Sequence, residues 1–353
     1  YPLIPRPDEY RGIAPDEVFA FRYRARIGPR DLAFHTATFR NKSDFNTHRL
    51  LRAIANNTLL SKLPPAEQGR ESDLLLPETQ LMHLYEAVPG LLRASANLLE
   101  QCSINMVFGK NKNKKCFNAD SATDLEHLNS LCEEGIPERY GEASPLIRER
   151  IRHELNLIGK QDFAAYFLIN WDIVRYARSR QYFYTGRGSG ANSIVAYLLR
   201  ITDVDPIDLD LYFERFINEH RSNPPDFDID FSWKDRDHII RYIFNRYGTE
   251  HTALLATYST FQDNAICREL GKVFGLPGAE IDKLANNWES EGGDRISRLI
   301  SIYGKRLRDF PSHLSIHAGG ILISEAPINA YTATNLPPKG FPTTQFSMLE
   351  AED

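Results

Sequence analysis

Hydrophobic residues recur at helical spacing in several separate segments of the chain, and this spacing predicts amphipathic helices with one buried face. The segments expected to be helical are residues 45–62, 77–102, 144–159, 166–180, 234–248 and most of 253–312. Ser144 and Pro145 suit the N-cap and first turn of one helix, and Gly159 suits its end. Pro89 and Gly90 divide the segment 77–102.

Three short segments have the composition or the alternation that is typical of strands. They are residues 182–184, 224–231 and 317–324. A glycine-rich turn is expected between the first strand and the helix that follows it. Because strands and helices are interleaved, the pattern predicts an α/β or α+β fold.

The segment PPDFDIDF, residues 224–231, carries Asp226, Asp228 and Asp230 at alternate positions. In a strand these carboxylates share one face, and the apolar residues between them share the other. Adjacent carboxylates repel each other, and a divalent cation removes that conflict. Magnesium binds through carboxylates and phosphates, and two such ions can promote phosphoryl transfer. The alternative is an exposed strand face with solvated aspartates.

The glycine-rich turn TGRGSGANS has Gly186, Gly188 and Gly190 separated by Arg187 and Ser189. Glycines let the backbone approach a ligand, and N–H groups at a helix start can bind phosphate. Ser189 adds a hydroxyl donor, and the guanidinium of Arg187 can form charge-assisted hydrogen bonds with phosphate. The turn is neither a Walker loop nor a complete dinucleotide fingerprint, and an ordinary tight turn is the alternative.

Two arginines, Arg215 and Arg221, lie between the glycine turn and the carboxylate strand. Either can reach the same triphosphate, although Arg215 can instead pair with Glu214 or a nearby aspartate. Together the phosphate turn, the arginines and the carboxylates predict a nucleotidyl transferase. The basic run at residues 109–115 is expected to be a solvated loop, with phosphate contact as the alternative.

Composition excludes some classes of protein. The net charge of −5 over 353 residues gives no overall nucleic-acid signature, so contact with a polyanion must come from local patches or bound cations. Four scattered cysteines without a CxxC pair argue against a zinc site and against a disulfide framework. No apolar run is long enough to span a membrane, and the start does not resemble a signal peptide. A cytoplasmic fragment of a longer protein is expected.

Four segments in this order, TGRGSGANSIVAYLLRITDVDPIDLDLYFERFIN, PPDFDIDF, TYST and HAGG, resemble the motifs of bacterial family C DNA polymerases. This is the family of the polymerase III alpha subunit. The resemblance covers residues 163–346, about half of the chain, and a weaker one covers residues 35–105.

The resemblance implies an α+β fold with a polymerase beta-like nucleotidyltransferase palm, a mixed sheet with helices. It also implies a helical thumb and the tail of a polymerase-and-histidinol-phosphatase (PHP) domain. The segment HTATFRN departs from the metal-binding pattern of that domain, so no phosphoesterase site is expected. The implied divisions are residues 1–115 for the PHP tail and connector, 116–256 for the first part of the palm, 257–312 for the thumb, and 313–353 for a truncated second part of the palm.

The resemblance also assigns roles to residues. Asp226 and Asp228 match the first two catalytic aspartates, which hold two Mg²⁺ ions, whereas Asp230 matches no metal ligand. His317 either contacts substrate or caps a strand. The residues implied to contact the nucleotide are Arg187, Gly188, Ser189, Arg215 and Arg221. The family's third catalytic aspartate follows the TTQF segment and is expected beyond residue 353.

The implied activity is template-dependent addition of dNTPs to a primer 3′-hydroxyl by a two-metal mechanism in bacterial replication. The implied partners are primer-template DNA, dNTPs, the sliding clamp and other replisome subunits, with no membrane. The fragment is expected to be inactive alone. The alternatives are another nucleotidyltransferase on the same palm and an inactive DNA-binding or scaffold module. The sequence leaves open whether the parent is the main replicase or an error-prone relative.

Overall fold

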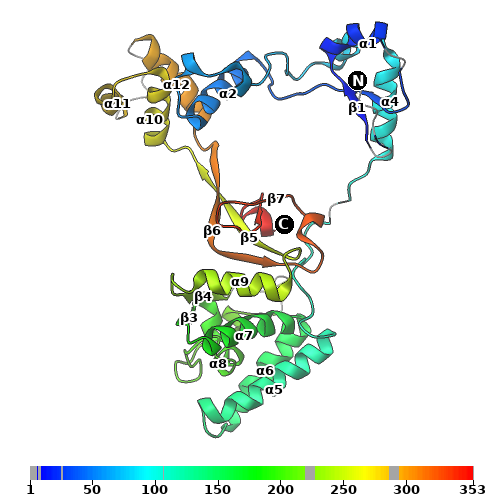
Figure 1. Ribbon diagram of the computed structural model, residues 1–353. Coiled ribbons are helices and arrows are strands. Elements are labelled where there is room, and N and C mark those ends of the chain that lie inside the picture. Colours follow the sequence, from blue (N-terminus) through cyan, green and yellow to red (C-terminus); the bar gives the residue numbers. More distant parts are fainter. Residues whose placement is uncertain are drawn as a thin grey trace. The chain divides into compact units, whose positions relative to one another are not determined.

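The computed structural model describes residues 6, 9–24, 27–105, 107–218, 227–285 and 294–352. Helices and strands are interleaved along the chain, as the sequence predicted (Figure 1). The chain forms two compact units. Unit 1 comprises Tyr1–Met106 and Ser259–Ser312, and unit 2 comprises Val107–Tyr258 and His313–Asp353. Each unit is therefore assembled from two separate stretches of sequence.

Unit 2 is built from both helices and strands. In chain order they are α5 (Ser121–Arg139), α6 (Pro145–Lys160), α7 (Ala164–Ser179), β3 (Tyr184–Arg187), α8 (Ile194–Leu198), β4 (Asp228–Phe231), α9 (Arg236–Tyr247), β5 (Thr252–Thr260), β6 (Pro311–Ile323), β7 (Thr334–Asn335) and β8 (Thr343–Thr344). The expected cap is present at the start of α6, where the hydroxyl of Ser144 accepts the N–H of Ile147. Helix α7 is the centre of the largest core, and its Phe167, Leu168 and Val174 are completely buried.

The described residues of unit 2 form two sheets. Strands β3 and β4 form an antiparallel pair, and the other sheet has the order β6-β5-β8-β7. Strand β8 pairs parallel with β5 and antiparallel with β7, so this sheet is mixed. Helix α9 lies between the β6-β5-β8-β7 sheet and the helical layer that contains α7 (Figure 1). Its apolar residues belong to two clusters. Ile239 and Ile243 pack in the core that includes α7, and Ile240 and Phe244 pack against Leu254 of β5.

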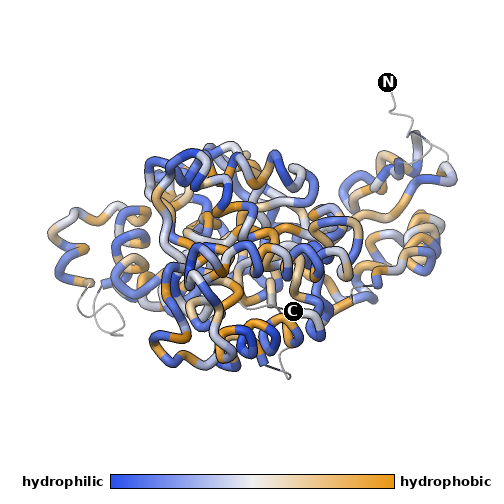
Figure 2. The backbone as a smooth tube through the Cα atoms, turned by 90° about the horizontal axis from the view of Figure 1, so that it is seen from below, coloured by the Kyte–Doolittle hydropathy of each residue, from blue (hydrophilic) through white to orange (hydrophobic). Residues whose placement is uncertain are grey.

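The described residues of unit 1 form two apolar clusters. Its helices and strands are β1 (Arg11–Ile13), α1 (Val18–Arg24), β2 (Asp31–Ala33), α2 (Lys42–Ala55), α3 (Glu78–Leu84), α4 (Pro89–Gln101), α10 (Asp263–Phe274), α11 (Gly278–Ala285) and α12 (Arg295–Leu307). One cluster joins α2, α10 and α12, and the other joins β1, α1 and α4. In Figure 2 hydrophobic and hydrophilic positions alternate along the helices, as amphipathic elements require.

The structure differs from the predicted elements in several places, including α5, which was not predicted, and α6, which continues through the expected end at Gly159 to Lys160. The helix expected over 45–62 ends at Ala55, and the strand expected at 182–184 lies at 184–187. The helical prediction was wrong for residues 253–260, which belong to β5. Its buried run from Ala253 to Ala256 has no polar alternation, and such a run does not distinguish a buried strand from a helix. Within the described residues, the helices are all too short or too polar to cross a bilayer.

Candidate functional site

Strand β4 separates acidic from apolar side chains, as its sequence predicted. Asp228 and Asp230 are exposed, and Ile229 between them is half-buried. Phe227 and Ile229 pack against the large core of unit 2. The strand is therefore anchored on its apolar face and presents two carboxylates on the other. The remaining aspartate of the motif, Asp226, lies outside the described residues.

Arg187 on β3 lies against both of these carboxylates. The register of the antiparallel pair places Arg187 opposite Asp228 and Thr185 opposite Asp230. The Nε atom of Arg187 is 2.6 Å from Oδ2 of Asp230, and its Nη1 atom is 3.4 Å from Oδ2 of Asp228. The hydrogen bond to Asp230 and the charges of both aspartates raise the pKa of Arg187. All three side chains are about half exposed or more, so solvent weakens these ion pairs.

The glycine turn also contacts the carboxylate strand. After β3 the chain makes a short 3-10 helix, Gly188–Asn192, and then enters α8. Gly188 has a φ of +75°, and a Cβ atom at this position would lie 2.7 Å from Oδ2 of Asp228. A Cβ atom at Gly190 would lie 2.5 Å from the ring of Phe227. Because these glycines have no side chain, the turn can lie close to β4 as well as to a ligand.

A buried carboxylate that the sequence analysis missed holds the start of α8. Glu154 of α6 is completely buried and accepts the hydroxyl of Ser193 at 2.8 Å. It also accepts the backbone N–H groups of Ile194 at 3.1 Å and Val195 at 3.3 Å. These bonds satisfy N–H groups in the first turn of α8 that have no partner within the helix. Burial raises the pKa of Glu154, and the neighbouring guanidinium and these donors oppose that effect.

Arg150, one helical turn before Glu154, connects this carboxylate to the glycine turn. Its Nε atom donates to Glu154 at 2.7 Å, and its Nη2 atom donates to the carbonyls of Asn192 and Leu211. The side chain of Asn192 in turn donates to the carbonyl of Ser189 at 2.8 Å. A signal was present in the sequence, because Glu154 interrupts an otherwise apolar stripe and lies four residues after an arginine.

The remaining predicted site residues do not contact these carboxylates. Ser189 is half-buried in the turn, and Arg215 is exposed in a separate 3-10 turn. Glu214 pairs with His153 at 3.0 Å, and within the described part of the chain Arg215 forms no ion pair. His317 lies half-buried in β6, where its Nδ1 atom accepts the N–H of Gly319 at 3.3 Å. Arg221 lies outside the described residues.

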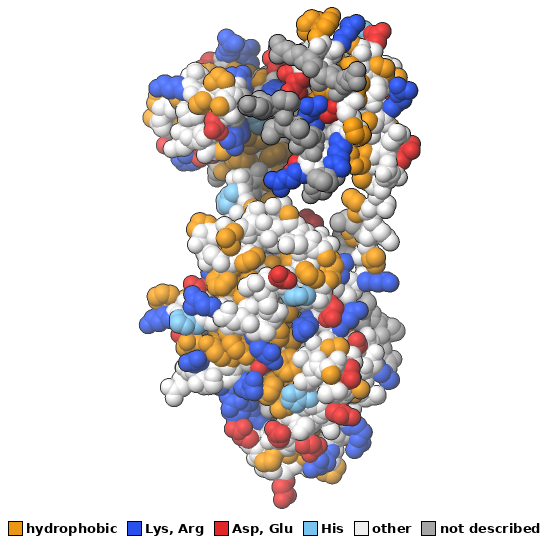
Figure 3. Space-filling model, turned by 45° about the vertical axis from the view of Figure 1, so that its right-hand side comes forward, with side chains coloured by type: hydrophobic (Ala, Val, Ile, Leu, Met, Phe, Trp, Pro, Cys, Tyr) orange, Lys and Arg blue, Asp and Glu red, His pale blue; other side chains and the backbone are white. Residues whose placement is uncertain are grey.

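The basic run at residues 109–115 is attached through its backbone to the end of β6. Asn113 forms an antiparallel β-bridge with Ser324, and the N–H of Lys114 donates to the carbonyl of Ile323 at 2.9 Å. The N–H of Lys115 donates to the carboxylate of Glu325 at 2.8 Å. On the face shown in Figure 3, basic side chains are interspersed with acidic and hydrophobic ones.

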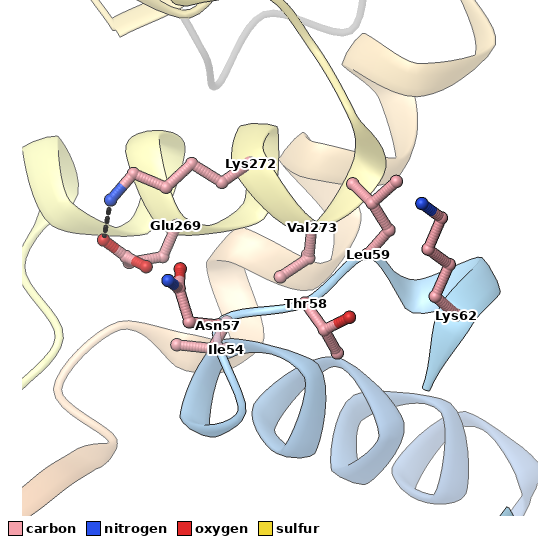
Figure 4. Close-up of a pocket in the computed structure, with 8 residues that line it drawn as sticks. All are labelled: Ile54, Asn57, Thr58, Leu59, Lys62, Glu269, Lys272 and Val273. Atoms are coloured by element: carbon pink, nitrogen blue, oxygen red, sulfur yellow. Dashed lines mark hydrogen bonds and ion pairs between the residues drawn. The ribbon is translucent and has the colours of Figure 1, made fainter. Parts of the chain in front are cut away.

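A cavity of about 230 Å³ lies in unit 1, apart from all the predicted site residues. Helix α10 contributes Glu269, Lys272 and Val273 to its lining, and the segment from α2 to Lys62 contributes the rest (Figure 4). The ammonium of Lys272 is paired with Glu269 at 2.7 Å. In the described ranges there is no group of three or more His, Cys, Asp or Glu that could hold a metal. The carboxylate face of β4 therefore remains the candidate site.

A comparison with known protein families supports the resemblance that the ordered motifs indicated. Residues 126–353 match the model of the bacterial DNA polymerase III alpha NTPase domain. The chain therefore belongs to the bacterial DNA polymerase III alpha family, and the resemblance found in its motifs is confirmed.

The similar proteins are named either DNA polymerase III subunit alpha or error-prone DNA polymerase. The DNA polymerase III subunit alpha of Bacillus subtilis (strain 168) is 34% identical over 332 residues, which cover 88% of this chain and 30% of the relative. An error-prone DNA polymerase of Symbiobacterium thermophilum is 32% identical over 335 residues, which cover 89% of this chain and 31% of the relative. The chain thus spans about a third of the length of these relatives. Their similar identities favour neither name for this chain.

Proposed function

We propose that the protein containing this chain is a DNA-directed DNA polymerase that adds dNTPs to the 3′-hydroxyl of a primer. The observation that carries this proposal is the β3–β4 pair. It presents Asp228, Asp230 and Arg187 on one exposed face, and the turn at Gly188 touches the first of these carboxylates. Carboxylates, a cation and a glycine turn in contact are the parts that nucleotidyl transfer requires. Membership of the polymerase III alpha family supports the same activity.

Unit 2 is proposed to be the palm, assigned to residues 116–256 and 313–353. It contains the β3–β4 pair and a mixed sheet, and it is interrupted by the segment Ser259–Ser312, which belongs to unit 1. This division supports a thumb over residues 257–312. Residues 1–115 are proposed to be the tail of a PHP domain and a connector.

The carboxylate face fits divalent cations. Asp228 and Asp230 already hold a cation there, the guanidinium of Arg187, and their oxygens are the hard donors that magnesium prefers. We assign two Mg²⁺ ions to Asp226 and Asp228. When bound, the ions supply a lower pKa at the 3′-hydroxyl and neutralise charge on the triphosphate.

The other side chains around this face are proposed to have different roles. Asp230 makes the shorter bond to Arg187, so it is proposed to orient the guanidinium rather than to bind metal. Nη1 of Arg187, which is 3.4 Å from Asp228, is then available to turn toward phosphate. Backbone and hydroxyl donors at Gly188 and Ser189 are proposed to hold the triphosphate.

Other assignments rest on the family motifs. Arg215 and Arg221 are proposed to contact the triphosphate, and His317 is proposed either to contact substrate or to cap a strand. The proposed partners are primer-template DNA, dNTPs, the sliding clamp and other replisome subunits in the bacterial cytoplasm.

Primer extension by the full-length protein tests the proposed activity. A labelled primer should lengthen only when template, dNTPs and Mg²⁺ are all present, and a chelator should stop the reaction. Extension that ignores the template would point to another nucleotidyltransferase. If a protein shown to be folded binds DNA but does not extend the primer, the proposed polymerase function is wrong and a DNA-binding module is favoured.

Replacing Gly188 by alanine should lower extension by about tenfold to a hundredfold, because a displacement of about 1 Å at a reacting group has effects of that size. The new Cβ would meet Oδ2 of Asp228 at 2.7 Å, so the carboxylate or the turn must move. Gly141→Ala is the matched control. Gly141 has a φ of +70°, close to that of Gly188, but a Cβ there meets nothing within 4 Å. Equal losses of extension in the two variants would show that backbone strain alone is responsible.

A further inference from the structure

Two aromatic side chains at one end of the β3–β4 pair are unusually exposed. Phe183 is 76% exposed and Trp233 is 82% exposed, and among the described large hydrophobic residues only Ile104 is more exposed than Trp233. The ammonium of Lys234 lies 5.8 Å from the centre of the Trp233 ring. Exposed aromatics are enriched where proteins bind other molecules, since they gain much apolar contact at little entropic cost.

Phe183 belongs to the same face as the carboxylates. The N–H of Ser232 donates to the carbonyl of Phe183 at 3.5 Å, which extends the pairing one step beyond Tyr184 and Phe231. Exposure alternates along this segment, with residues 183, 185 and 187 exposed and residues 184 and 186 partly or fully buried. Side chains two residues apart share a face, so Phe183 follows Thr185 and Arg187 on the exposed side. At about 3.3 Å per residue, Phe183 lies about 13 Å along the strand from Arg187.

The order of groups along this face indicates on which side of the reacting phosphorus Phe183 lies. The glycine turn starts at Gly188, directly after Arg187 and Asp228, and Phe183 is at the opposite end of the strand. In an in-line displacement the attacking and leaving oxygens lie on opposite sides of the reacting phosphorus. If the triphosphate occupies the glycine turn, the leaving group is on that side. The attacking strand then passes the end that carries Phe183.

We propose that Phe183 packs against the deoxyribose of a nucleotide near the 3′ end of the primer strand. This proposal rests on the proposed polymerase function. Paired bases are stacked within the duplex, so the apolar surface that the strand offers to a side chain is chiefly its sugars. Lys234 is exposed beside Trp233 and supplies a positive charge for the phosphates of the same strand.

The test uses the full-length protein and primer-template duplexes that carry one 2′-O-methyl nucleotide. The modified position is scanned over about the last six primer nucleotides, because about 13 Å corresponds to about four nucleotides at about 3.4 Å each. Dissociation constants are measured by fluorescence anisotropy with Mg²⁺ and without dNTPs. The proteins compared are the wild type, Phe183→Ala, Phe183→Leu and the control Phe108→Ala, since Phe108 is 68% exposed in the same unit but does not belong to the β3–β4 pair.

We expect Phe183→Ala to weaken binding of the unmodified duplex by about fivefold, and Phe108→Ala to leave it unchanged. At one primer position the 2′-O-methyl group should weaken binding by the wild type but not by Phe183→Ala, because the alanine removes the clash. Phe183→Leu should be intermediate, which separates loss of a contact from loss of folding.

A different result would overturn the proposal in a recognisable way. If the wild type extends primers but every modification affects all variants alike, the contact is refuted and the polymerase function stands. If the wild type neither binds nor extends primers, the proposed function fails, and the contact fails with it.

Discussion

Replacing Asp228 by asparagine in the full-length protein is expected to lower the rate of primer extension by more than about a thousandfold. The substitution keeps the size of the side chain and removes the negative charge that is proposed to hold magnesium. The aspartate is about half exposed, so the change should leave the fold of unit 2 intact. Binding of primer-template DNA should change little, because Asp228 is proposed to hold magnesium rather than to contact the duplex. Extension and binding are measured on the same preparation, with a thermal melt to verify folding.

Asp208→Asn is the matched control for this variant. Asp208 is an exposed aspartate of the same unit, outside the β3–β4 pair. The control should extend primers at the wild-type rate. Asp228→Asn activity within a few-fold of wild type would refute the catalytic assignment, and an equal loss in the control would show that the effect is one of overall charge.

The carboxylate strand could be predicted because its signal is local. Alternation in PPDFDIDF is a property of adjacent residues, and Asp228, Ile229 and Asp230 follow it in the structure. Some helix starts and ends with local chemistry were also predictable, such as the cap at Ser144 and the glycine end at Gly248, whereas α6 continues past the expected end at Gly159. In each case, the energy that decides the conformation comes from groups within a few residues.

The contacts around the carboxylates could not be predicted in this way, because they join distant parts of the chain. Arg187 and Asp230 are 43 residues apart, and their bond depends on the register of two strands. The glycine-rich motif predicted a phosphate contact for Arg187, and only the register shows that its guanidinium also pairs with the aspartates. The close approach of Gly188 to Asp228 likewise follows from tertiary packing. The expected helix at 253–260 failed for the same reason, since pairing within a buried sheet outweighs local propensity.

Glu154 is the clearest example of a residue whose role depends on burial. By composition it is one more charge on an amphipathic helix, yet its side chain is completely buried and holds Arg150, Ser193 and the start of α8. Burying a carboxylate is costly unless the whole set of partners is present. The ion pair is therefore better explained as a device that fixes the glycine turn than as a source of net stability.

Replacing Glu154 by alanine is expected to lower the free energy of unfolding of unit 2 by about 3–5 kcal/mol, because it leaves Arg150 and the N–H groups of α8 without their buried partner. Urea denaturation followed by the fluorescence of Trp171, a residue of α7 in unit 2, measures this loss. The control is Glu133→Ala, since Glu133 pairs with Arg148 at 3.6 Å with both side chains 54% exposed. That variant should change stability by no more than about 0.5 kcal/mol.

A double variant, Arg150→Met with Glu154→Leu, separates the unpaired charge from the lost hydrogen bonds. If the unpaired guanidinium causes most of the loss, the double variant should be more stable than Glu154→Ala. It should still raise the KM for dNTPs, because Arg150 no longer holds the carbonyl of Asn192, whose side chain supports Ser189 in the turn. A double variant with restored stability and an unchanged KM would show that the network serves folding alone. A raised KM with restored stability would show that it also positions the triphosphate turn.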